Sequence, residues 1–192
     1  MSQPSGKRVL REEVLAARAA LPVAERRRAD AALAAAARRL VFGAARVAGY
    51  APLPDEPGGS ALPDELAAAL PPGGLLLPAL RPDRDLDWVR YDGTLTAGGM
   101  LRAVREPPGA RLGLDAIATV EIVFVPALAV DPTGARLGRG GGSYDRALTR
   151  VAPGVPVIAL LYPDELVPAV PTQPHDRPVT AVLTPAGLRN LR

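Results

Sequence analysis

The chain has 192 residues, 48% of them hydrophobic, which is enough for one domain with a sizeable core, and we expect a single domain over residues 1–192. Its 23 basic and 20 acidic residues leave a net charge of +3, and it has no cysteine and one histidine, His175. This composition excludes disulfides, thiolate zinc sites, cysteine nucleophiles and two-histidine metal sites. Any bound metal would be a hard cation held by carboxylate and phosphate oxygens.

The sequence shows no pattern of a membrane-spanning helix or of a signal peptide. No apolar run approaches the ~20 residues that a membrane-spanning helix needs. The N-terminus also lacks the charged and apolar regions of a signal peptide. We therefore expect a cytoplasmic protein without a membrane partner. Separately, we expect a monomer.

The first half of the chain predicts two helices and then strands separated by turns. Apolar residues recur at helical spacing from Leu10 to Leu21, and Pro22 separates this helix from the next. In chain order, we predict helices over 7–20 and 23–40, a strand over 46–51, a short helix over 62–70 and strands over 75–78 and 86–91. An antiparallel orientation is one possibility for the last of these strands.

The second half begins with a loop-like stretch over 93–118. We then predict the strongest strand over 119–125, a long loop, a helix over 144–151 and strands over 155–162 and 179–183. Helices that alternate with short apolar strands are typical of α/β proteins, so we predict a three-layer sandwich with a mainly parallel central sheet and helices on both faces. Ligands of such sheets bind beyond the carboxyl ends of the strands, which here are followed by the loops after Ala51, Val125 and Tyr162.

The loop after the strongest strand is rich in glycine and reads DPTGARLGRGGGSYDR over 131–146. Its glycines allow a ligand to approach the backbone closely, its arginines add positive charge, and the following helix offers free N–H groups. This composition favours a phosphate-binding loop over a flexible surface loop, although it matches neither common phosphate-binding motif. Asp145 begins the next helix, where it could complement the helix dipole or bind magnesium beside a polyphosphate.

Lys7, Arg11 and Arg18 fall beside the buried stripe of the first helix, given ~100° of rotation per residue. Cations at the edge of a core often bury only their stems. The equal alternative is a basic stripe that meets an anion at the wall of a pocket.

Two further segments place polar residues in loops. Asp55 and Glu56 follow the first predicted strand, and His175 and Asp176 lie between prolines. Loop acids are usually solvated, and a single histidine more often packs than catalyses. Ser143 with His175 does not indicate a hydrolase, because GGGSYD lacks the G-x-S-x-G turn.

These segments together resemble the 5-formyltetrahydrofolate cyclo-ligase family, also called 5,10-methenyltetrahydrofolate synthetases. The segment VPALAVDPTGARLGRGGGSYDR is similar to the family signature VPG(L)xFDxxGxRLGxG(K/G)GYYD. Four shorter segments match in the same order: KRVLR at 7–11, YAPLPDE at 50–56, VREPPG at 104–109 and HDRPV at 175–179. The chain departs from the signature at Ala127, Val130 and Ser143, where the family has Gly, Phe and an aromatic residue.

The resemblance implies an α/β fold and an ATP- and Mg²⁺-dependent enzyme that closes 5-formyltetrahydrofolate to the 5,10-methenyl form, releasing ADP and phosphate. It implies ATP contacts from Lys7, Arg11, Arg136, Gly138, Arg139, Gly140, Gly141, Gly142, Ser143 and Tyr144. It implies folate contacts from Ala51, Glu56, Arg139, Gly140, Gly141, Gly142 and Ser143. Arg139 and Tyr144 would be catalytic, and Asp145 and Asp176 would bind the metal.

Two other functions are weighed against this one. A non-catalytic nucleotide- or folate-binding relative would keep the scaffold, but such a protein could lose any of the five residues Lys7, Arg11, Glu56, Asp145 and Asp176. An RNA-binding module is suggested by the isoelectric point of about 9.8. The small net charge and the 4% content of aromatic residues disfavour it, because single-strand readers stack bases on aromatic rings. We therefore expect no nucleic-acid partner.

Overall fold

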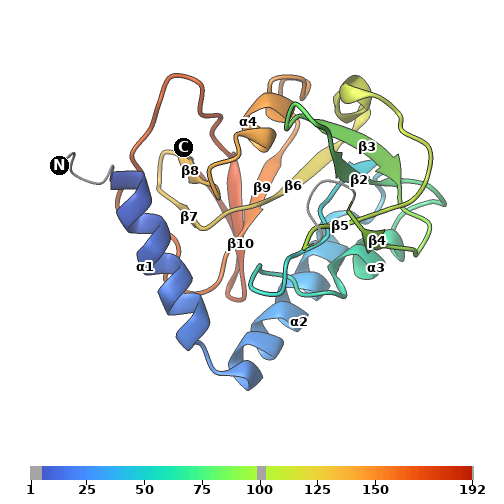
Figure 1. Ribbon diagram of the computed structural model, residues 1–192. Helices are drawn as coiled ribbons and strands as arrows, with labels where there is room; N and C mark the ends of the chain where they lie inside the picture. Colours follow the sequence, from blue (N-terminus) through green and yellow to red (C-terminus); the bar gives the residue numbers. More distant parts are fainter. Residues whose placement is uncertain (1–5, 99–102, 192) are drawn as a thin grey trace.

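A seven-stranded sheet forms the centre of the computed structural model, which describes residues 6–98 and 103–191 (Figure 1). The strand order is β11-β10-β9-β6-β1-β2-β3. The strands are β1 (Val47–Ala48), β2 (Leu75–Leu80), β3 (Leu86–Arg90), β6 (Ile122–Pro126), β9 (Val157–Leu160), β10 (Ala181–Thr184) and β11 (Gly187–Asn190). The five inner strands are parallel, and the edge strands β3 and β11 are antiparallel to their neighbours. The predicted sheet is confirmed, including the antiparallel orientation of its third predicted strand.

Both faces of the sheet are apolar because successive side chains of each strand point to opposite faces. Phe124 and Leu160 lie on one face, whereas their neighbours Val125 and Ala159 lie on the other. All four side chains are fully buried. This explains why the inner strands read as continuous apolar runs rather than as alternating ones.

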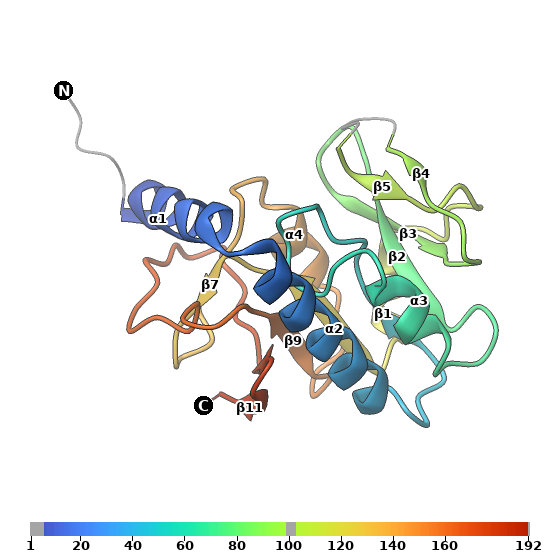
Figure 2. The ribbon, with the colours of Figure 1, turned by 90° about the horizontal axis from the view of Figure 1, so that it is seen from below.

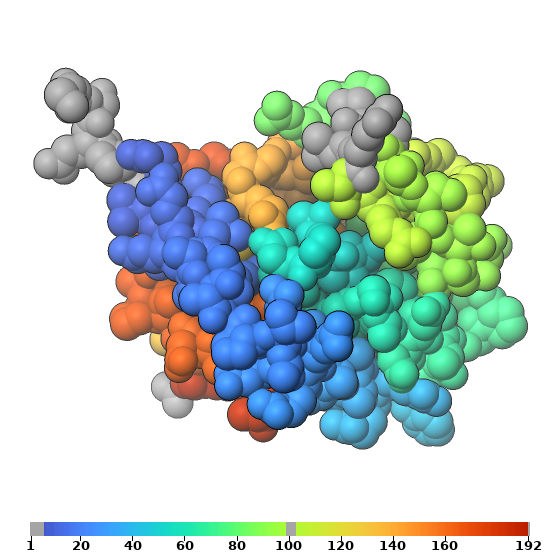
Figure 3. All heavy atoms as spheres, turned by 60° about the horizontal axis from the view of Figure 1, so that its bottom comes forward, coloured from blue at the N-terminus to red at the C-terminus, as the bar shows by residue number. Residues whose placement is uncertain are grey.

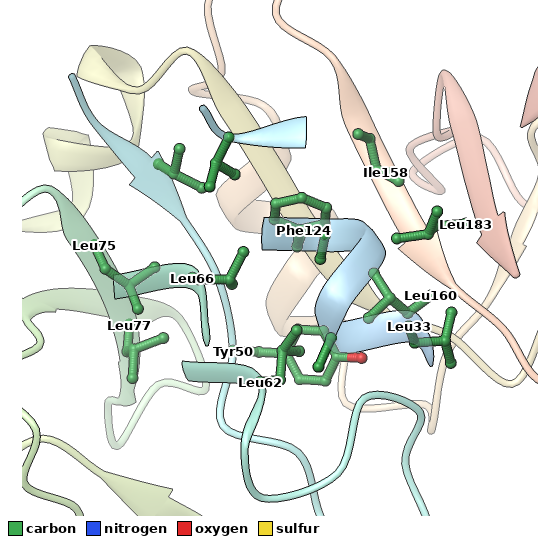
Figure 4. Packing of buried hydrophobic residues seen from close by; sticks show 14 of the residues in the cluster. Leu33, Tyr50, Leu62, Leu66, Leu75, Leu77, Phe124, Ile158, Leu160 and Leu183 are labelled. Carbon is green, nitrogen blue, oxygen red and sulfur yellow. The ribbon is translucent and has the colours of Figure 1, made fainter. Parts of the chain in front are cut away.

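Helices cover both faces of this sheet, which confirms the three-layer sandwich. The α-helices are α1 (Gly6–Ala20), α2 (Val23–Leu40), α3 (Leu62–Ala67) and α4 (Ser143–Leu148), and η1 (Leu114–Thr119) is a 3₁₀ helix. Helices α2 and α3 bury Leu33 and Leu66 against the Phe124 face (Figure 4). On the other face, η1 and α4 bury Ile117 and Leu148. None of the helices in the described part of the chain has the length and apolar character needed to cross a membrane.

Helix α1 does not pack on the central sheet. It packs through Leu10, Val14 and Leu15 against a small antiparallel pair formed by β7 (Ala129–Val130) and β8 (Arg136–Leu137). In Figure 2, α1 stands apart from the helices that cover the sheet. Since β8 lies within the glycine-rich loop and runs directly into Gly138, α1 is held beside the glycines of that loop.

Several predicted boundaries are wrong where elements are short. The predicted loop over 93–118 contains β4 (Thr96–Ala97), β5 (Arg105–Glu106) and most of η1, while its residues 99–102 lie outside the described chain. Strand β6 therefore begins at Ile122 rather than at 119. The β7–β8 pair and β11 were not predicted, because strands of two to four residues carry too few positions for a period to be recognised.

Candidate functional site

A pocket of about 300 Å³ opens beyond the carboxyl ends of β1, β2 and β6. It is lined by Lys7, Arg11, Tyr50, Ala51, Leu53, Glu56, Pro78, Leu80, Leu86, Val104, Arg105, Pro126, Ala127, Leu128, Arg136, Leu137, Gly138, Arg139, Gly140, Gly141, Gly142, Ser143, Tyr144, Asp145, Gln173, His175 and Asp176. In the space-filling view, α1 (blue), the segment near residue 55 (teal) and the glycine-rich loop (orange) meet on one face (Figure 3). The position of the pocket is that expected for a ligand site of a parallel sheet.

The pocket brings together every residue for which the sequence predicts an ATP, folate or metal contact. These residues are Lys7, Arg11, Ala51, Glu56, Arg136, Gly138, Arg139, Gly140, Gly141, Gly142, Ser143, Tyr144, Asp145 and Asp176. Of the three loops expected at the ligand end, those after Ala51 and Val125 line the pocket. The loop after Tyr162 contributes only through its distant continuation at Gln173, His175 and Asp176.

The glycine-rich loop is anchored to α1 by Arg11. The Nε of Arg11 donates a hydrogen bond of 2.8 Å to the carbonyl oxygen of Gly138. Gly140, two residues further along the loop, has φ +98°, a left-handed conformation that residues with a Cβ rarely adopt. The loop therefore depends on glycine for its path and on a cation of α1 for its attachment.

Arg136 is buried at the base of the pocket, with a side chain only 4% exposed. Its Nη2 donates a 2.9 Å hydrogen bond to Oδ1 of Asp145, and its guanidinium lies 5.8 Å from the centre of the Tyr144 ring. Its Nε is buried without a hydrogen-bond partner among the described residues. Because an unpaired buried donor is unfavourable, this group is a candidate for a ligand contact.

Tyr144 and Asp145 occupy the first turn of α4, as the sequence predicts. Burial raises the pKa of Tyr144 far above its usual value, and the negative charge of Glu56 adds to the shift. The phenol is therefore a hydrogen-bond donor at neutral pH rather than a base. Asp145 Oδ1 also accepts the backbone N–H of Arg177, so its carboxylate joins α4 to the segment after β9.

Lys7 and Asp176 form an ion pair at the other side of the pocket, with 2.5 Å between Nζ and Oδ2. Burial tends to raise the pKa of Asp176, but the Lys7 hydrogen bond and the backbone N–H of Gln173 outweigh it and hold the pKa below its usual value. His175 is exposed, and its Nε2 lies 3.8 Å from Asp176 Oδ1. A single histidine is more often packed in the core, but the His175 side chain is not buried.

Arg139 crosses from the glycine-rich loop to the loop after β1. Its Nη2 lies 2.6 Å from both carboxylate oxygens of Asp55, and its Nε donates a 3.0 Å hydrogen bond to Oε1 of Glu56. Burial tends to raise the pKa of Asp55, but the Arg139 hydrogen bond and charge hold it below its usual value. Acids in loops are usually solvated, but both of these acids are paired with Arg139.

Arg18 does not line the pocket, so only Lys7 and Arg11 of the three cations beside the buried stripe of the first helix lie at the pocket wall. The side chain of Arg18 is buried, and its Nε and Nη2 donate to the two carboxylate oxygens of Glu165 at 2.6 and 2.8 Å. It also donates to the carbonyl oxygens of Ala127 and Asp55. The anion that Arg18 meets is therefore an internal carboxylate.

Three carboxylates of the described residues line the pocket, and two of them, Asp145 and Asp176, are the predicted metal ligands, while Glu56 is paired with Arg139. No group of three or more acidic or histidine side chains within residues 6–98 and 103–191 could hold a metal. Mg²⁺ commonly uses one or two carboxylates and takes its other ligands from water and phosphate. The donor set therefore fits a magnesium ion that arrives with a polyphosphate, and does not fit a permanent structural metal.

An apolar wall of the pocket was not predicted from the sequence. Tyr50, Leu80, Leu86 and Val104 line it, and the Tyr50 hydroxyl donates to the carbonyl oxygen of Pro57. Leu80 and Leu86 flank the turn between β2 and β3. That turn, RPDRD, could have indicated that these leucines end their strands at the ligand edge of the sheet.

Comparisons with known proteins place these residues in context. A model described as the 5-formyltetrahydrofolate cyclo-ligase family matches residues 3–185. A 5-formyltetrahydrofolate cyclo-ligase of Mycolicibacterium smegmatis is 41% identical over 191 residues, covering 95% of each chain. One from Mus musculus is 33% identical over 86 residues, or 42% of each chain.

Solved structures agree with this similarity. The structure of Aquifex aeolicus 5,10-methenyltetrahydrofolate synthetase has a TM-score of 0.75 and 28% identity, and the match covers 97% of this chain and 93% of that one. A 5,10-methenyltetrahydrofolate synthetase from Mycoplasma pneumoniae has the same fold, with a TM-score of 0.73 at 17% identity over 94% of this chain and 99% of that one. The resemblance predicted from the sequence motifs is confirmed.

Proposed function

Because the chain belongs to the 5-formyltetrahydrofolate cyclo-ligase family and is an enzyme of that family, we propose that its pocket binds ATP and 5-formyltetrahydrofolate together and joins N5 and N10 through the formyl carbon. The family implies ATP as the co-substrate. The observation that carries the proposal is the convergence of basic residues, glycine-rich loop and carboxylates on one pocket. The family assignment argues against the non-catalytic alternative.

The nucleotide half of the pocket is formed by α1 and the glycine-rich loop. Lys7, Arg11 and Arg139 would neutralise the phosphates, and the buried Nε of Arg136 would supply a further donor. Gly138, Gly140, Gly141, Gly142, Ser143 and Tyr144 would surround the nucleotide. Such a set suits phosphoryl transfer, which needs positioning and charge neutralisation more than a nucleophilic side chain.

The folate half is formed by the loop after β1 and the apolar wall. Glu56 would accept hydrogen bonds from the N–H groups of the pterin edge, and Ala51 would pack beside it. The apolar side chains of Tyr50, Leu80 and Leu86 suit an aromatic ring system. Arg139, Gly140, Gly141, Gly142 and Ser143 lie between the halves and would contact both ligands.

The reaction proceeds in two steps in this proposal. The formyl oxygen attacks the γ-phosphorus of ATP, a P–O bond forms, and the bond to ADP breaks. The N10 lone pair then attacks the formyl carbon, the C–O bond to phosphate breaks, and N10 loses its proton to solvent. Arg139 would stabilise the charge on the transferred phosphoryl group, and the Tyr144 phenol would donate a hydrogen bond to an oxygen that becomes negative.

Asp145 and Asp176 would hold a magnesium ion together with phosphate oxygens. A bound Mg²⁺ would supply charge neutralisation at the phosphates. Asp145 is ion-paired with Arg136 and Asp176 with Lys7, and both carboxylates line the pocket. A cytoplasmic location and a monomeric state stay predictions.

The test is an assay with 5-formyltetrahydrofolate, ATP and Mg²⁺ that follows the near-ultraviolet absorbance of the methenyl product. We expect product only when all three are present, and none without ATP. Excess chelator should abolish the reaction, because two carboxylates alone bind a divalent ion weakly. Full turnover in chelator would refute the assignment of Asp145 and Asp176, and no product under any condition would refute the proposed reaction.

A further inference from the structure

We propose that Asp55 is a positioning residue of the cyclo-ligase reaction. Together with Glu56 it holds the Nε and Nη2 edge of Arg139, so that the Nη1 edge faces an anionic group in the pocket. This inference rests on the proposed function, in which Arg139 acts on the transferred phosphoryl group. Asp55 does not itself line the pocket, whereas Glu56 and Arg139 do.

The loop that carries Asp55, called the platform below, is held by hydrogen bonds to three other elements. Arg18 holds the Asp55 backbone through its carbonyl oxygen at 3.2 Å. The Tyr162 hydroxyl lies 2.8 Å from Oδ1 of Asp30 and 3.3 Å from the carbonyl oxygen of Glu56, so it lies between α2 and this loop. Asp30 accepts the backbone N–H of Gly58 at 3.1 Å. The loop is thus fixed from α1, from α2 and from the end of β9, independently of the glycine-rich loop.

The loop that carries Arg139 has the opposite character. Gly138 precedes Arg139, and Gly140, Gly141 and Gly142 follow it, so the backbone on both sides of Arg139 lacks the restriction that a Cβ imposes. A guanidinium on such a backbone loses much of its precision unless another group restrains it. Asp55 supplies that restraint, because both of its carboxylate oxygens lie 2.6 Å from Nη2.

The donors of Arg139 are divided between the platform and the pocket. Nε binds Glu56 and Nη2 binds Asp55, while Nη1 has no hydrogen-bond partner among the described residues. A guanidinium offers a planar fork of five N–H groups, so fixing one edge determines where the other points. Arg139 can therefore donate from Nη1 to a phosphate oxygen without leaving the two carboxylates.

Stability of the fold is a poor explanation for this pair. Asp55 and Arg139 each have side chains 38% exposed, and exposed ion pairs contribute little to stability. The chain offers a matched pair in Arg38 and Glu65, which lie 3.0 Å apart, also with Glu65 38% exposed, but outside the pocket. If Asp55 only formed a surface ion pair, neutralising Asp55 and neutralising Glu65 would have the same effect on turnover.

The test is a double-mutant cycle of turnover with Asp55→Asn, Arg139→Ala and the double variant, using 5-formyltetrahydrofolate, ATP and Mg²⁺. We expect Asp55→Asn to lower turnover about tenfold, since small misplacements of a catalytic group have large effects. In the Arg139→Ala background the same substitution should change turnover less than about twofold, because its effect is transmitted through the missing side chain. Asp55→Glu should recover part of the loss.

Guanidinium ion provides a readout that a structural role would not change. Millimolar guanidinium should restore part of the turnover of Arg139→Ala, and adding Asp55→Asn should raise the half-maximal guanidinium concentration at least about fivefold, because a charged hydrogen bond to the ion is lost. Glu65→Gln should change neither turnover nor this rescue.

Three results would overturn the proposal. They are additive losses in the cycle, wild-type turnover for Asp55→Asn, and a gain of turnover or ATP affinity on that substitution, which would make Asp55 a competitor for Arg139. An active wild-type enzyme with any of these refutes the inference only. An inert wild-type protein refutes the proposed function and this inference with it.

Discussion

Several charged residues of the pocket are paired with opposite charges, most of them from distant parts of the chain. Lys7 pairs with Asp176, Arg136 with Asp145, and Arg139 with Asp55 and Glu56. The motifs predict the pocket-lining members of these pairs but not which residues pair, because pairing depends on how loops far apart in sequence meet. Arg18 illustrates the limit: its helical position is equally compatible with a cation at the edge of the core and with one at a pocket wall, and in the structure it binds Glu165 inside the protein.

Glu56→Gln is expected to impair folate use far more than ATP binding. A carboxylate can accept two parallel N–H bonds from a pterin, whereas an amide offers one acceptor and turns a donor toward a donor. The loss should be about 2–4 kcal/mol, or ~30- to 1000-fold in kcat/KM for folate. Steady-state kinetics and calorimetry with ATP would measure it. Reduced ATP affinity with unchanged folate kinetics would place Glu56 at the nucleotide instead.

Arg139→Ala is expected to weaken ATP binding by about 1–3 kcal/mol, because a hydrogen-bonding cation near the phosphates is lost. Calorimetric titration with a non-hydrolysable ATP analogue would measure the change. Arg38→Ala removes an exposed arginine of a comparable ion pair and should leave the affinity unaltered. Equal affinities of wild type and Arg139→Ala would return the glycine-rich loop to a purely structural role.

Among the secondary-structure elements, turns and short strands set the shape of the pocket. Long helices and buried strands follow from the sequence because their apolar residues repeat over many positions. The β7–β8 pair spans two residues in each strand, so no period predicts it. Its turn is held by Asp131, whose carboxylate accepts the N–H groups of Thr133, Ala135 and Val170.

Gly134→Ala is expected to destabilise the fold much more than Gly154→Ala. Both glycines have nearly the same positive φ, 86° and 85°, so both substitutions incur about 1–2 kcal/mol of backbone strain. A Cβ at Gly134 would also collide with the carbonyl oxygen of Val179, whereas a Cβ at Gly154 meets nothing within 4 Å. Urea unfolding should show at least ~2 kcal/mol of extra loss for Gly134→Ala. Equal losses would show that the turn can shift.

Asp131→Asn is expected to lower stability in a pH-dependent manner. Burial tends to raise the Asp131 pKa, but its hydrogen bonds with Thr133, Val170 and Ala135 hold it below the usual value. A carboxylate whose pKa is depressed by folding stabilises the protein above its unfolded pKa of about 3.9, and this contribution disappears as the pH falls through the folded pKa.

The free energy of unfolding should therefore differ most between wild type and Asp131→Asn above about pH 5, by about 1–3 kcal/mol. The difference should shrink as the pH falls below about 4, because the wild-type carboxyl then becomes protonated. Urea titrations from pH 6 to the acid range would measure it. A difference that is constant with pH would mean that Asp131 holds the turn without its charge.

Considered as a whole, the molecule builds its pocket from segments that span most of the chain. Helix α1 supplies cations, the loop after β1 supplies Ala51 and Glu56, and the segment around residue 140 supplies the glycines. The apolar repeat predicts the sheet on which these segments are mounted. It does not predict the distances across the pocket, since those depend on side chains that reach from one loop to another.

The Lys7–Asp176 ion pair, which joins residues 169 positions apart, has a consequence for how the protein is made. Chains emerge from the ribosome with the N-terminus first. Helix α1 therefore emerges early, and Lys7 can form its ion pair with Asp176 only after almost the whole chain has been synthesised. Loop closure over such a distance is slow relative to local structure. The pocket is thus among the last parts of the protein to form, and a nascent chain that already holds β1 and β2 cannot yet bind its ligands.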